Sequence, residues 1–243
     1  MLTRIGVRPR GKNSARSLMD KLRETGAEAV SAVDPELAAD VSALVTAPEE
    51  IEAAQTIAAR HAATLEVLAH ALDARHAGSE GASKRVMDLS LRIGRRLEVS
   101  DDILVELARG ALLRDIGKMR VPNSVLLKDG LLTYDEWSLI QNHTILGAEL
   151  AAATPGLADI AAIARFHHEC FDGTGYPDKL EGGRIPLVAR IVRLADVYIA
   201  MRSPRPYRTS VASNDEAVEH IREEREKHFD PEVVDAFLEI RTD

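Results

Sequence analysis

The sequence contains a single cysteine, Cys170, among its 243 residues. One cysteine excludes an intrachain disulfide framework and fits a reducing compartment. The chain also lacks an apolar run long enough to span a bilayer, since the alanine-rich stretch 150–164 is interrupted by Thr154, Pro155 and Asp159. No signal peptide or lipidation motif is recognisable. We therefore expect a cytoplasmic protein that does not associate with membranes.

The chain also has fewer positively than negatively charged residues. The 31 Lys and Arg residues are outnumbered by 39 Asp and Glu residues, which gives a net charge of −8. This balance argues against a nucleic-acid-binding surface, although a local basic pocket can still receive a phosphate group. A hydrophobic content of 45% over this length suffices for one medium-sized core and a small additional unit.

Residues 1–46 differ in pattern from the rest of the chain. Short apolar stretches at 2–7 and 41–46 predict strands, and 15–24 predicts a helix between them. We expect a small α/β appendage over 1–46. A connecting helix over 47–75 follows, because Thr46, Pro48 and Glu49 form the pattern of a capped helix start.

The connecting helix has an apolar stripe. From Ile51 to Leu72, small or apolar residues recur at alternating steps of three and four. Such a 3.5-residue period can form a seam with a second helix, which predicts a homodimer through residues 51–72. The alternative is that Leu65, Leu68 and Leu72 pack on their own domain.

Beyond this helix, no segment alternates like a strand. Helical periodicity and flanking turn residues predict helices at 80–97, 101–113, 134–153, 156–168, 186–202, 214–227 and 231–240. The helix starts are marked by capping residues, namely Ser100, Thr133 with Glu136, Ser213 with Glu216, and Asp230 before Pro231. The expected fold is mainly α, a helical bundle with the small α/β appendage at its N-terminal side.

Two adjacent histidines, His167 and His168, precede a glycine-rich turn at 172–177. Imidazole is the commonest metal ligand near neutral pH, so the pair suggests a metal site. Gly173 and Gly175 then supply turn chemistry, because glycine adopts positive φ without a steric penalty. The segment predicts a shaped loop next to a metal.

Three more polar residues, Asp115, His143 and Asp196, lie in otherwise apolar helical segments. Buried carboxylates are costly unless they are paired or bind a metal. Together with the two adjacent histidines they offer the oxygen and nitrogen donors that iron, manganese and zinc accept. The predicted metal ligands are therefore Asp115, His143, His167, His168 and Asp196.

The order of these motifs resembles that of the HD-GYP domains, bacterial metal-dependent phosphodiesterases that hydrolyse cyclic di-GMP. The matching segments follow one another in family order at 112–118 with 121–122, 126–133, 143–147, 167–177, 189–191, 195–198, 205–208 and 229–231. The resemblance implies an HD-type helical bundle over residues 62–243. It also implies cyclic di-GMP or a related nucleotide as the ligand.

The chain departs from this family at metal-ligand positions. Arg114 stands where the family has the histidine of its HD pair, and Ala82 stands where the family has its first histidine. Ile199 replaces a residue that is commonly acidic. Arginine has no lone pair to offer and stays protonated, so it cannot ligate a cation. By the family's ligand assignment, one metal site here keeps only Asp115 and Asp196.

The second metal site keeps all of its ligands, which are Asp115, His143, His167 and His168. We therefore expect no more than one divalent transition metal per chain, namely iron, manganese or zinc. We also expect the fixed charge of Arg114 to pair with Asp115 or Asp196 in place of the missing metal.

The resemblance also implies roles near the substrate. Asp115 and Lys118 match catalytic positions, and Tyr176, Arg205 and Arg208 match positions that in the family lie near the substrate phosphate or guanine. Arg114 matches no such position, but we expect it to bind substrate as a further cation near the vacant metal position.

Three functions remain open. The first is a degenerate signalling domain that binds nucleotide or a protein partner with impaired hydrolysis. The second is a slow or altered phosphodiesterase that acts on cyclic di-GMP or a related phosphoester. The third is a structural interaction module.

Overall fold

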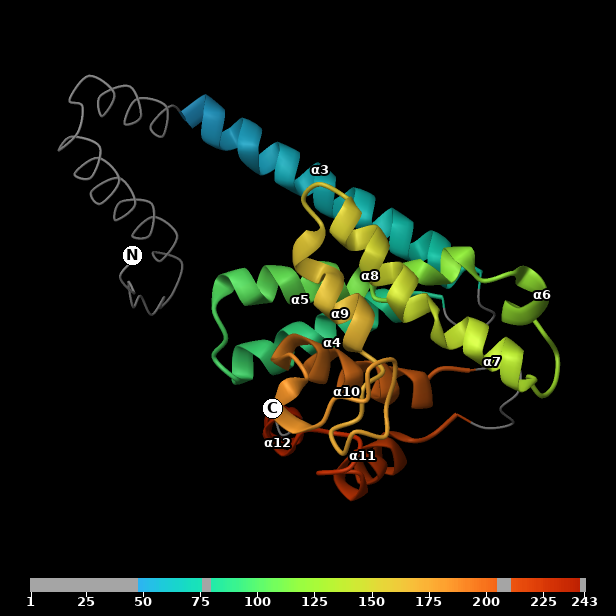
Figure 1. The fold of residues 1–243 in the computed structure, drawn as a ribbon. Helices are drawn as coiled ribbons and strands as arrows, with labels where there is room; N and C mark the ends of the chain where they lie inside the picture. Colours follow the sequence, from blue (N-terminus) through green and yellow to red (C-terminus); the bar gives the residue numbers. More distant parts are fainter. Residues whose placement is uncertain (1–47, 76–79, 205–210, 241–243) are drawn as a thin grey trace. The chain divides into compact units, whose positions relative to one another are not determined.

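The computed structural model describes residues 48–75, 80–204 and 211–240 (Figure 1). The chain divides into two compact units, Met1–His61 and Ala62–Asp243. All predicted site residues belong to the second unit. The α/β appendage expected at 1–46 and the cap expected at Thr46 lie outside the described residues.

The described chain is built from helices, and no strand occurs in the described ranges. In order, the helices are α3 (Pro48–Asp73), α4 (Ala82–Arg96), α5 (Asp101–Leu113), α6 (Asn123–Leu126), α7 (Tyr134–Gln141), α8 (His143–Ala153), α9 (Ala161–Phe166), α10 (Leu187–Met201), α11 (Asn214–Glu223) and α12 (Pro231–Glu239). Short 3-10 turns lie at η1 (Ile116–Arg120), η2 (Ala158–Ile160) and η3 (Gly182–Arg184). The mainly helical fold class is confirmed. Among the helices described, none has both the length and the apolar character needed to cross a membrane.

The predicted capping residues start their helices as expected. The Ser100 hydroxyl accepts a hydrogen bond from the Ile103 amide at the start of α5. Reciprocal capping boxes open α7 and α11, and the Asp230 carboxylate caps α12. Each cap satisfies amide groups that have no partner within the helix, and this fixes where the helix begins.

The single helix predicted at 134–153 is wrong, because α7 ends at Gln141 and α8 starts at His143. The His143 Nδ1 bonds the Ile140 carbonyl, and the Thr144 hydroxyl donates to the Gln141 carbonyl. Side chains that bond nearby carbonyls compete with the helix backbone and favour a break. The break places His143 in the first turn of α8.

Two other predicted helices are shorter than expected. The segment 156–168 opens as the 3-10 turn η2 and becomes α-helical only at α9. The segment 214–227 stops at Glu223, and Glu226 has a φ of 69°, which no right-handed helix contains.

The main core forms around α10, which packs against α4, α5, α9, α11 and α12. Its largest fully buried members include Ile93, Leu107, Ile191, Leu194 and Phe237. α10 is therefore held from several sides. This rigidity fixes the positions of the polar residues that α10 presents to the site.

A second core cluster ties the C-terminal part of α3 to the domain. Leu65 and Ala69 are buried there against Leu112 and Leu113. Leu65 thus packs on its own domain, which is the alternative to the dimer seam that the sequence left open. Leu68 is 44% exposed, so the homodimer through residues 51–72 stays a prediction.

Candidate metal and nucleotide site

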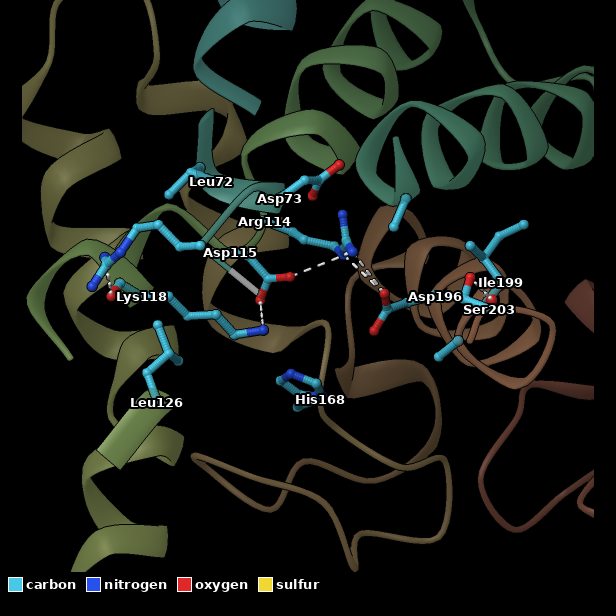
Figure 2. A pocket seen from close by; sticks show the side chains of 13 residues that line it. Leu72, Asp73, Arg114, Asp115, Lys118, Leu126, His168, Asp196, Ile199 and Ser203 are labelled. Atoms are coloured by element: carbon cyan, nitrogen blue, oxygen red, sulfur yellow. Dashed lines mark hydrogen bonds and ion pairs between the residues drawn. The ribbon is translucent and has the colours of Figure 1, made fainter. Parts of the chain in front are cut away.

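A cavity of about 130 Å³ opens between α3, α4, η1 and α10 (Figure 2). Its lining combines cationic, acidic and apolar side chains, which include Arg75, Ala82, Arg114, Asp115, Lys118, Leu126, His168, Asp196 and Ile199. Several sequence-predicted site residues therefore surround one space. Ala82, which the family resemblance places at the position of a histidine ligand, is among them.

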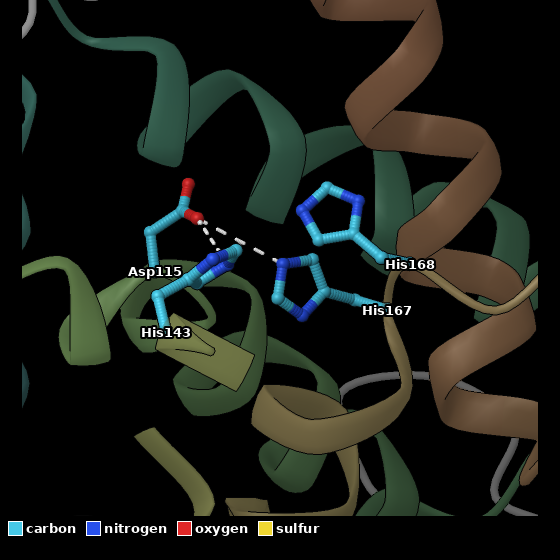
Figure 3. A group of neighbouring side chains, drawn as sticks. All are labelled: Asp115, His143, His167 and His168. Carbon is cyan, nitrogen blue, oxygen red and sulfur yellow. Dashed lines mark ion pairs between the residues drawn. The ribbon is translucent and has the colours of Figure 1, made fainter. Parts of the chain in front are cut away.

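Four of the predicted metal ligands come together beside this cavity (Figure 3). Asp115 follows α5, His143 starts α8, and His167 and His168 follow α9. One potential ligand atom from each of the four lies within 4.8 Å of the others. Residues separated by up to 53 positions in the sequence thus form a single cluster.

Two of the histidines are oriented by backbone carbonyl groups. The Nδ1 of His143 contacts the Ile140 carbonyl, and the Nδ1 of His167 lies 3.1 Å from the Ile163 and Ala164 carbonyls. A carbonyl only accepts hydrogen bonds, so each Nδ1 carries a proton, and in the neutral ring Nε2 has a free lone pair. A metal-binding histidine usually donates a hydrogen bond of this kind from its other ring nitrogen.

The free lone pairs converge on Asp115. Its Oδ1 lies 3.3 Å from the His143 Nε2 and 3.8 Å from the His167 Nε2. These three atoms are buried and make no hydrogen bond, although the Lys118 ammonium lies 2.7 Å from the same oxygen. Buried polar atoms are normally satisfied. The arrangement fits a bound cation, because one metal would satisfy all three atoms.

The protonation states also suit a metal. Burial lowers the pKa of His167 and lowers that of His168 further, so both rings are neutral at pH 7. Burial opposes the charge of Asp115, but Lys118 and Arg114 outweigh it and hold the pKa well below its usual range. Neutral imidazole and ionised carboxylate are the forms that bind metals.

A close backbone approach positions the cluster. A Cβ atom on Gly117 would lie 1.9 Å from the His143 carbonyl oxygen and 2.6 Å from the Gly147 amide nitrogen. Only glycine at position 117 lets η1 lie directly on α8. This contact brings Asp115, two residues earlier, up to His143.

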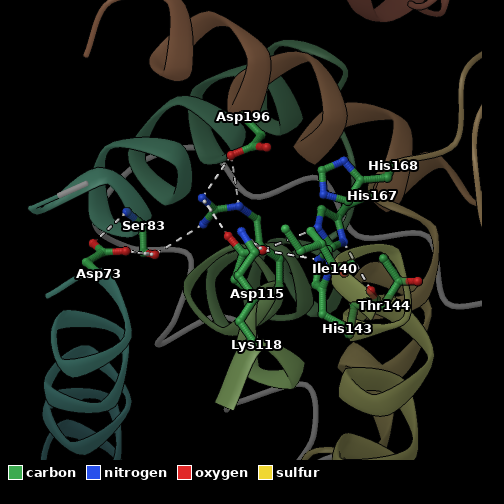
Figure 4. Close-up of polar contacts among 12 residues, drawn as sticks. Asp73, Ser83, Asp115, Lys118, Ile140, His143, Thr144, His167, His168 and Asp196 are labelled. Carbon is green, nitrogen blue, oxygen red and sulfur yellow. Dashed lines mark hydrogen bonds and ion pairs between the residues drawn. The ribbon is translucent and has the colours of Figure 1, made fainter. Parts of the chain in front are cut away.

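Arg114 fills the other side of the site (Figure 2), and Figure 4 labels its partners Asp115, Asp196 and Ser83. Its Nε and Nη2 lie 3.0 and 2.8 Å from the Asp196 Oδ1, and its Nη2 lies 3.4 Å from the Asp115 Oδ2. Its Nη1 donates to the Ser83 hydroxyl and to the Ala111 carbonyl. The hydrogen bonds use Nε and Nη1, and Nη2 faces the carboxylates of Asp196 and Asp115 as an ion pair. The expected pairing of Arg114 with Asp115 and Asp196 is confirmed.

The guanidinium is almost completely buried but remains charged. Burial opposes the charge of Arg114, but Asp196, Asp115 and Asp73 more than compensate and raise its pKa. Asp73, at the end of α3, accepts hydrogen bonds from the Ser83 amide and hydroxyl at 3.0 and 2.7 Å. A chain of polar contacts therefore links α3 and α4 to Arg114.

Asp196 is not part of the four-residue cluster. Its carboxylate faces Arg114 instead, whose charge holds the pKa of Asp196 below its usual range despite burial. For Arg114 to contact a substrate, as the sequence predicts, the side chain would have to release one of its present partners.

The loop after the histidines is shaped around Glu169. This buried carboxylate accepts hydrogen bonds from the Asp178 and Leu180 amides at 2.7 and 3.2 Å. Gly175 allows a close approach, since a Cβ there would lie 2.2 Å from the Cys170 amide nitrogen. Tyr176 is thereby stacked on His168, with ring centroids 4.8 Å apart.

Some residues lie outside the described ranges and others were missed. Arg205 and Arg208 belong to the segment 205–210, which is not described. The sequence analysis missed the hydrogen bonds that link Asp73 through Ser83 to Arg114. It also missed Arg193, whose Nη1 lies 3.4 Å from the Nδ1 of His168. For Arg193 a signal was available, because it stands one helical turn before Asp196 in an otherwise apolar stretch.

The helical bundle encloses a histidine and carboxylate cluster that could hold a metal ion, and comparison with known proteins identifies the class of the domain. The sequence pattern of the HD domain matches residues 66–233. The chain belongs to the HD-domain family. Its phosphodiesterases are metal-dependent, in agreement with the cluster at Asp115.

Curated relatives carry names of cyclic-dinucleotide phosphodiesterases. The cyclic di-GMP phosphodiesterase response regulator RpfG of Xanthomonas campestris is 39% identical over 75% of this chain and 48% of its own. A cyclic di-GMP phosphodiesterase of Thermotoga maritima is 37% identical over 72% and 48%. The 3'3'-cGAMP-specific phosphodiesterase 3 of Vibrio cholerae is 37% identical over 66% and 35%. The chain thus spans about half or less of the length of these relatives.

Solved structures support the fold. A cyclic GMP-AMP specific phosphodiesterase of Vibrio cholerae has a TM-score of 0.61 at 22% identity, covering 75% of this chain and 49% of its own. Bd1817, an HD-GYP-type protein of Bdellovibrio bacteriovorus, has a TM-score of 0.56 at 19% identity, covering 96% and 80%. The predicted relationship to cyclic di-GMP phosphodiesterases is confirmed.

Proposed function

We propose that this chain is a signalling domain that binds a cyclic dinucleotide and hydrolyses it poorly. The observation that carries the proposal is the position of Arg114, whose guanidinium pairs with Asp115 and Asp196 and also donates hydrogen bonds to Ser83 and Ala111. In the HD-GYP domains, the residues at positions 114, 115 and 196 would bind a metal.

A guanidinium can balance the charge of the carboxylates but cannot replace the chemistry of a metal. Two-metal phosphodiesterases hold the attacking and leaving oxygens between two cations that have open coordination positions. Arg114 has no open coordination position, and its guanidinium is already paired with Asp115 and Asp196. Binding interactions that do not depend on this position are therefore kept, whereas the clamp on the reacting oxygens is lost.

The remaining cluster suits one divalent transition metal, for which iron, manganese and zinc are candidates. Asp115, His143, His167 and His168 would hold it. A metal there would supply a Lewis acid beside a phosphoryl oxygen. Lys118 would add a fixed positive charge at the same place, 2.7 Å from Asp115.

Cyclic di-GMP is the first nucleotide to test, and 3'3'-cGAMP is the second, because relatives of this chain are named for both. Lys118 and His168 line the cavity and offer contacts to phosphate. Tyr176, stacked on His168, offers an aromatic face for a base. Arg205 and Arg208 are proposed as further phosphate contacts on the family resemblance.

The test measures bound and cleaved cyclic di-GMP in one sample of purified protein, with and without added manganese. We expect saturable binding and turnover far below that of an intact HD-GYP phosphodiesterase assayed in parallel. A His167→Ala variant is the control, since it removes a cluster ligand. Rapid wild-type hydrolysis that this variant abolishes would refute the impaired-hydrolysis proposal.

The second candidate is an active but slow or altered phosphodiesterase. It is favoured by the complete cluster of Asp115, His143, His167 and His168. Restoring both histidines in an Ala82→His, Arg114→His variant distinguishes the two proposals. A large gain in turnover supports impaired hydrolysis in the natural chain, whereas unchanged substantial turnover supports the altered phosphodiesterase.

A further inference from the structure

His168 differs from the other two histidines in what its ring contacts. The Nδ1 atoms of His143 and His167 face backbone carbonyls, but the Nδ1 of His168 lies 3.4 Å from the Nη1 of Arg193. The close pairs with Asp115 also involve only His143 and His167, as the dashed lines in Figure 3 show. His168 is the histidine of the three that lines the cavity.

The partner determines where the proton of the ring lies. A guanidinium can only donate hydrogen bonds, so the Nδ1 of His168 must accept. In a neutral imidazole the proton is then on Nε2. The other two rings have the opposite tautomer, with the proton on Nδ1 and a lone pair on Nε2.

Arg193 is well suited to impose this tautomer. It makes no ion pair with a carboxylate among the described residues; its Nη2 lies 3.5 Å from the Cys170 sulfur, and its Nε is buried without a partner. α10 is packed on several sides, so the residue has little freedom to move. Because arginine stays protonated at all physiological pH values, its effect on His168 does not reverse.

We infer that His168 in this chain donates a hydrogen bond to the phosphate of a bound nucleotide instead of binding the metal, and that Arg193 holds it in the donating form. This inference rests on the proposed function and refines its metal site. The metal ligands are then Asp115, His143 and His167, whose facing atoms are the three buried atoms without hydrogen bonds. Three protein ligands with an open position are the usual arrangement of a catalytic metal site.

The first test needs neither a variant nor a metal. In the metal-free, 15N-histidine-labelled full chain, long-range proton–nitrogen correlation spectra report which ring nitrogen carries the proton. We expect the proton of His168 on Nε2 and those of His143 and His167 on Nδ1. A proton on Nδ1 of His168 would overturn the inference, whether or not the protein binds nucleotide.

The second test titrates the metal-free protein with zinc. We expect His168→Gln to bind zinc within about threefold of wild type, and His143→Gln and His167→Gln to bind at least about tenfold more weakly. Equal losses in all three variants would show that His168 is a ligand. If the wild-type protein binds no zinc, the proposed metal site fails, and the spectra still decide the tautomer.

Replacing Arg193 tests separately whether this residue holds His168 in the donating form. In Arg193→Met the Nδ1 of His168 is free to carry the proton, so we expect tighter zinc binding, and the gain should vanish in the double variant with His168→Gln. Arg184→Met, on the exposed turn η3, controls for the loss of one positive charge. A gain that persists without His168 would mean that Arg193 acts only through its charge.

The fourth test measures cyclic di-GMP affinity without metal. His168→Ala removes the donor and is expected to weaken binding about tenfold, whereas His168→Gln, whose amide can donate, is expected to retain most of it. If alanine and glutamine are equally harmful, or equally harmless, His168 does not act as a donor to the nucleotide.

Discussion

The Nη2 of Arg114 lies 2.8 Å from the Oδ1 of Asp196, so a side chain at the end of α5 neutralises a carboxylate on α10. Both residues belong to a buried network that also contains Asp115 and, through Ser83, Asp73. The network joins helices that are distant in sequence. Its charge balance affects stability as well as chemistry.

Replacing Arg114 by Met should destabilise the fold. The change leaves the carboxylates of Asp196 and Asp115 without their buried cation, and breaking a buried pair in this way costs about 3–5 kcal/mol. Urea unfolding followed by circular dichroism measures the loss. Arg165→Met is the control, since its pair with Asp178 is more exposed and should contribute about 0–1 kcal/mol. Similar losses in both variants would mean that Arg114 is not a structural cation.

Metal content should not exceed one ion per chain. By the family resemblance, Ala82 and Arg114 stand where two histidines would bind one metal, and the two carboxylates left for that metal are paired with Arg114 instead. Elemental analysis of protein purified without chelator provides the count. The double variant Ala82→His, Arg114→His is expected to approach two ions per chain. Two ions in the natural chain would refute the assignment.

Gly117→Ala should disrupt the metal-ligand cluster around Asp115 and His143, although Gly117 is not itself a ligand. The new methyl group would collide with the His143 carbonyl, and backbone cannot move aside as a flexible side chain can. We expect a loss of about 1–3 kcal/mol in unfolding free energy and weaker zinc binding. Gly183→Ala is the matched control, because a Cβ there meets nothing within 4 Å. Unchanged zinc affinity in Gly117→Ala would show that the close approach of η1 and α8 is not required.

The predicted homodimer is tested on the exposed apolar residues of α3. Val67 and Leu68 are 68% and 44% exposed, so charging them should not harm the core. If α3 forms the seam, Val67→Glu with Leu68→Glu should convert a dimer to a monomer in size-exclusion chromatography with light scattering. Val105→Glu, at an exposed position of α5, should leave the dimer intact. A wild-type protein that is monomeric at high concentration would exclude the seam.

Much of the local structure follows from the sequence alone. The helix starts at Ser100, Thr133, Ser213 and Asp230 are where the capping residues place them, because a cap depends on neighbours within one turn. The end of one helix at Gln141 was missed, since it depends on the side chain of His143 bonding a carbonyl. Side-chain bonds to the backbone are not visible in hydrophobic periodicity.

The sequence by itself determined which donor residues this protein possesses, and its resemblance to the HD-GYP domains predicted that Ala82 and Arg114 replace ligands. Only the tertiary structure decided how these residues are used. Asp196 has the side chain of a metal ligand, but its carboxylate faces Arg114. His168 is chemically identical to its neighbour His167, but its Nδ1 faces Arg193. The reason is physical: the proton of an imidazole and the partner of a carboxylate depend on atoms a few ångströms away, which the packing of α5, α9 and α10 brings together from distant parts of the chain.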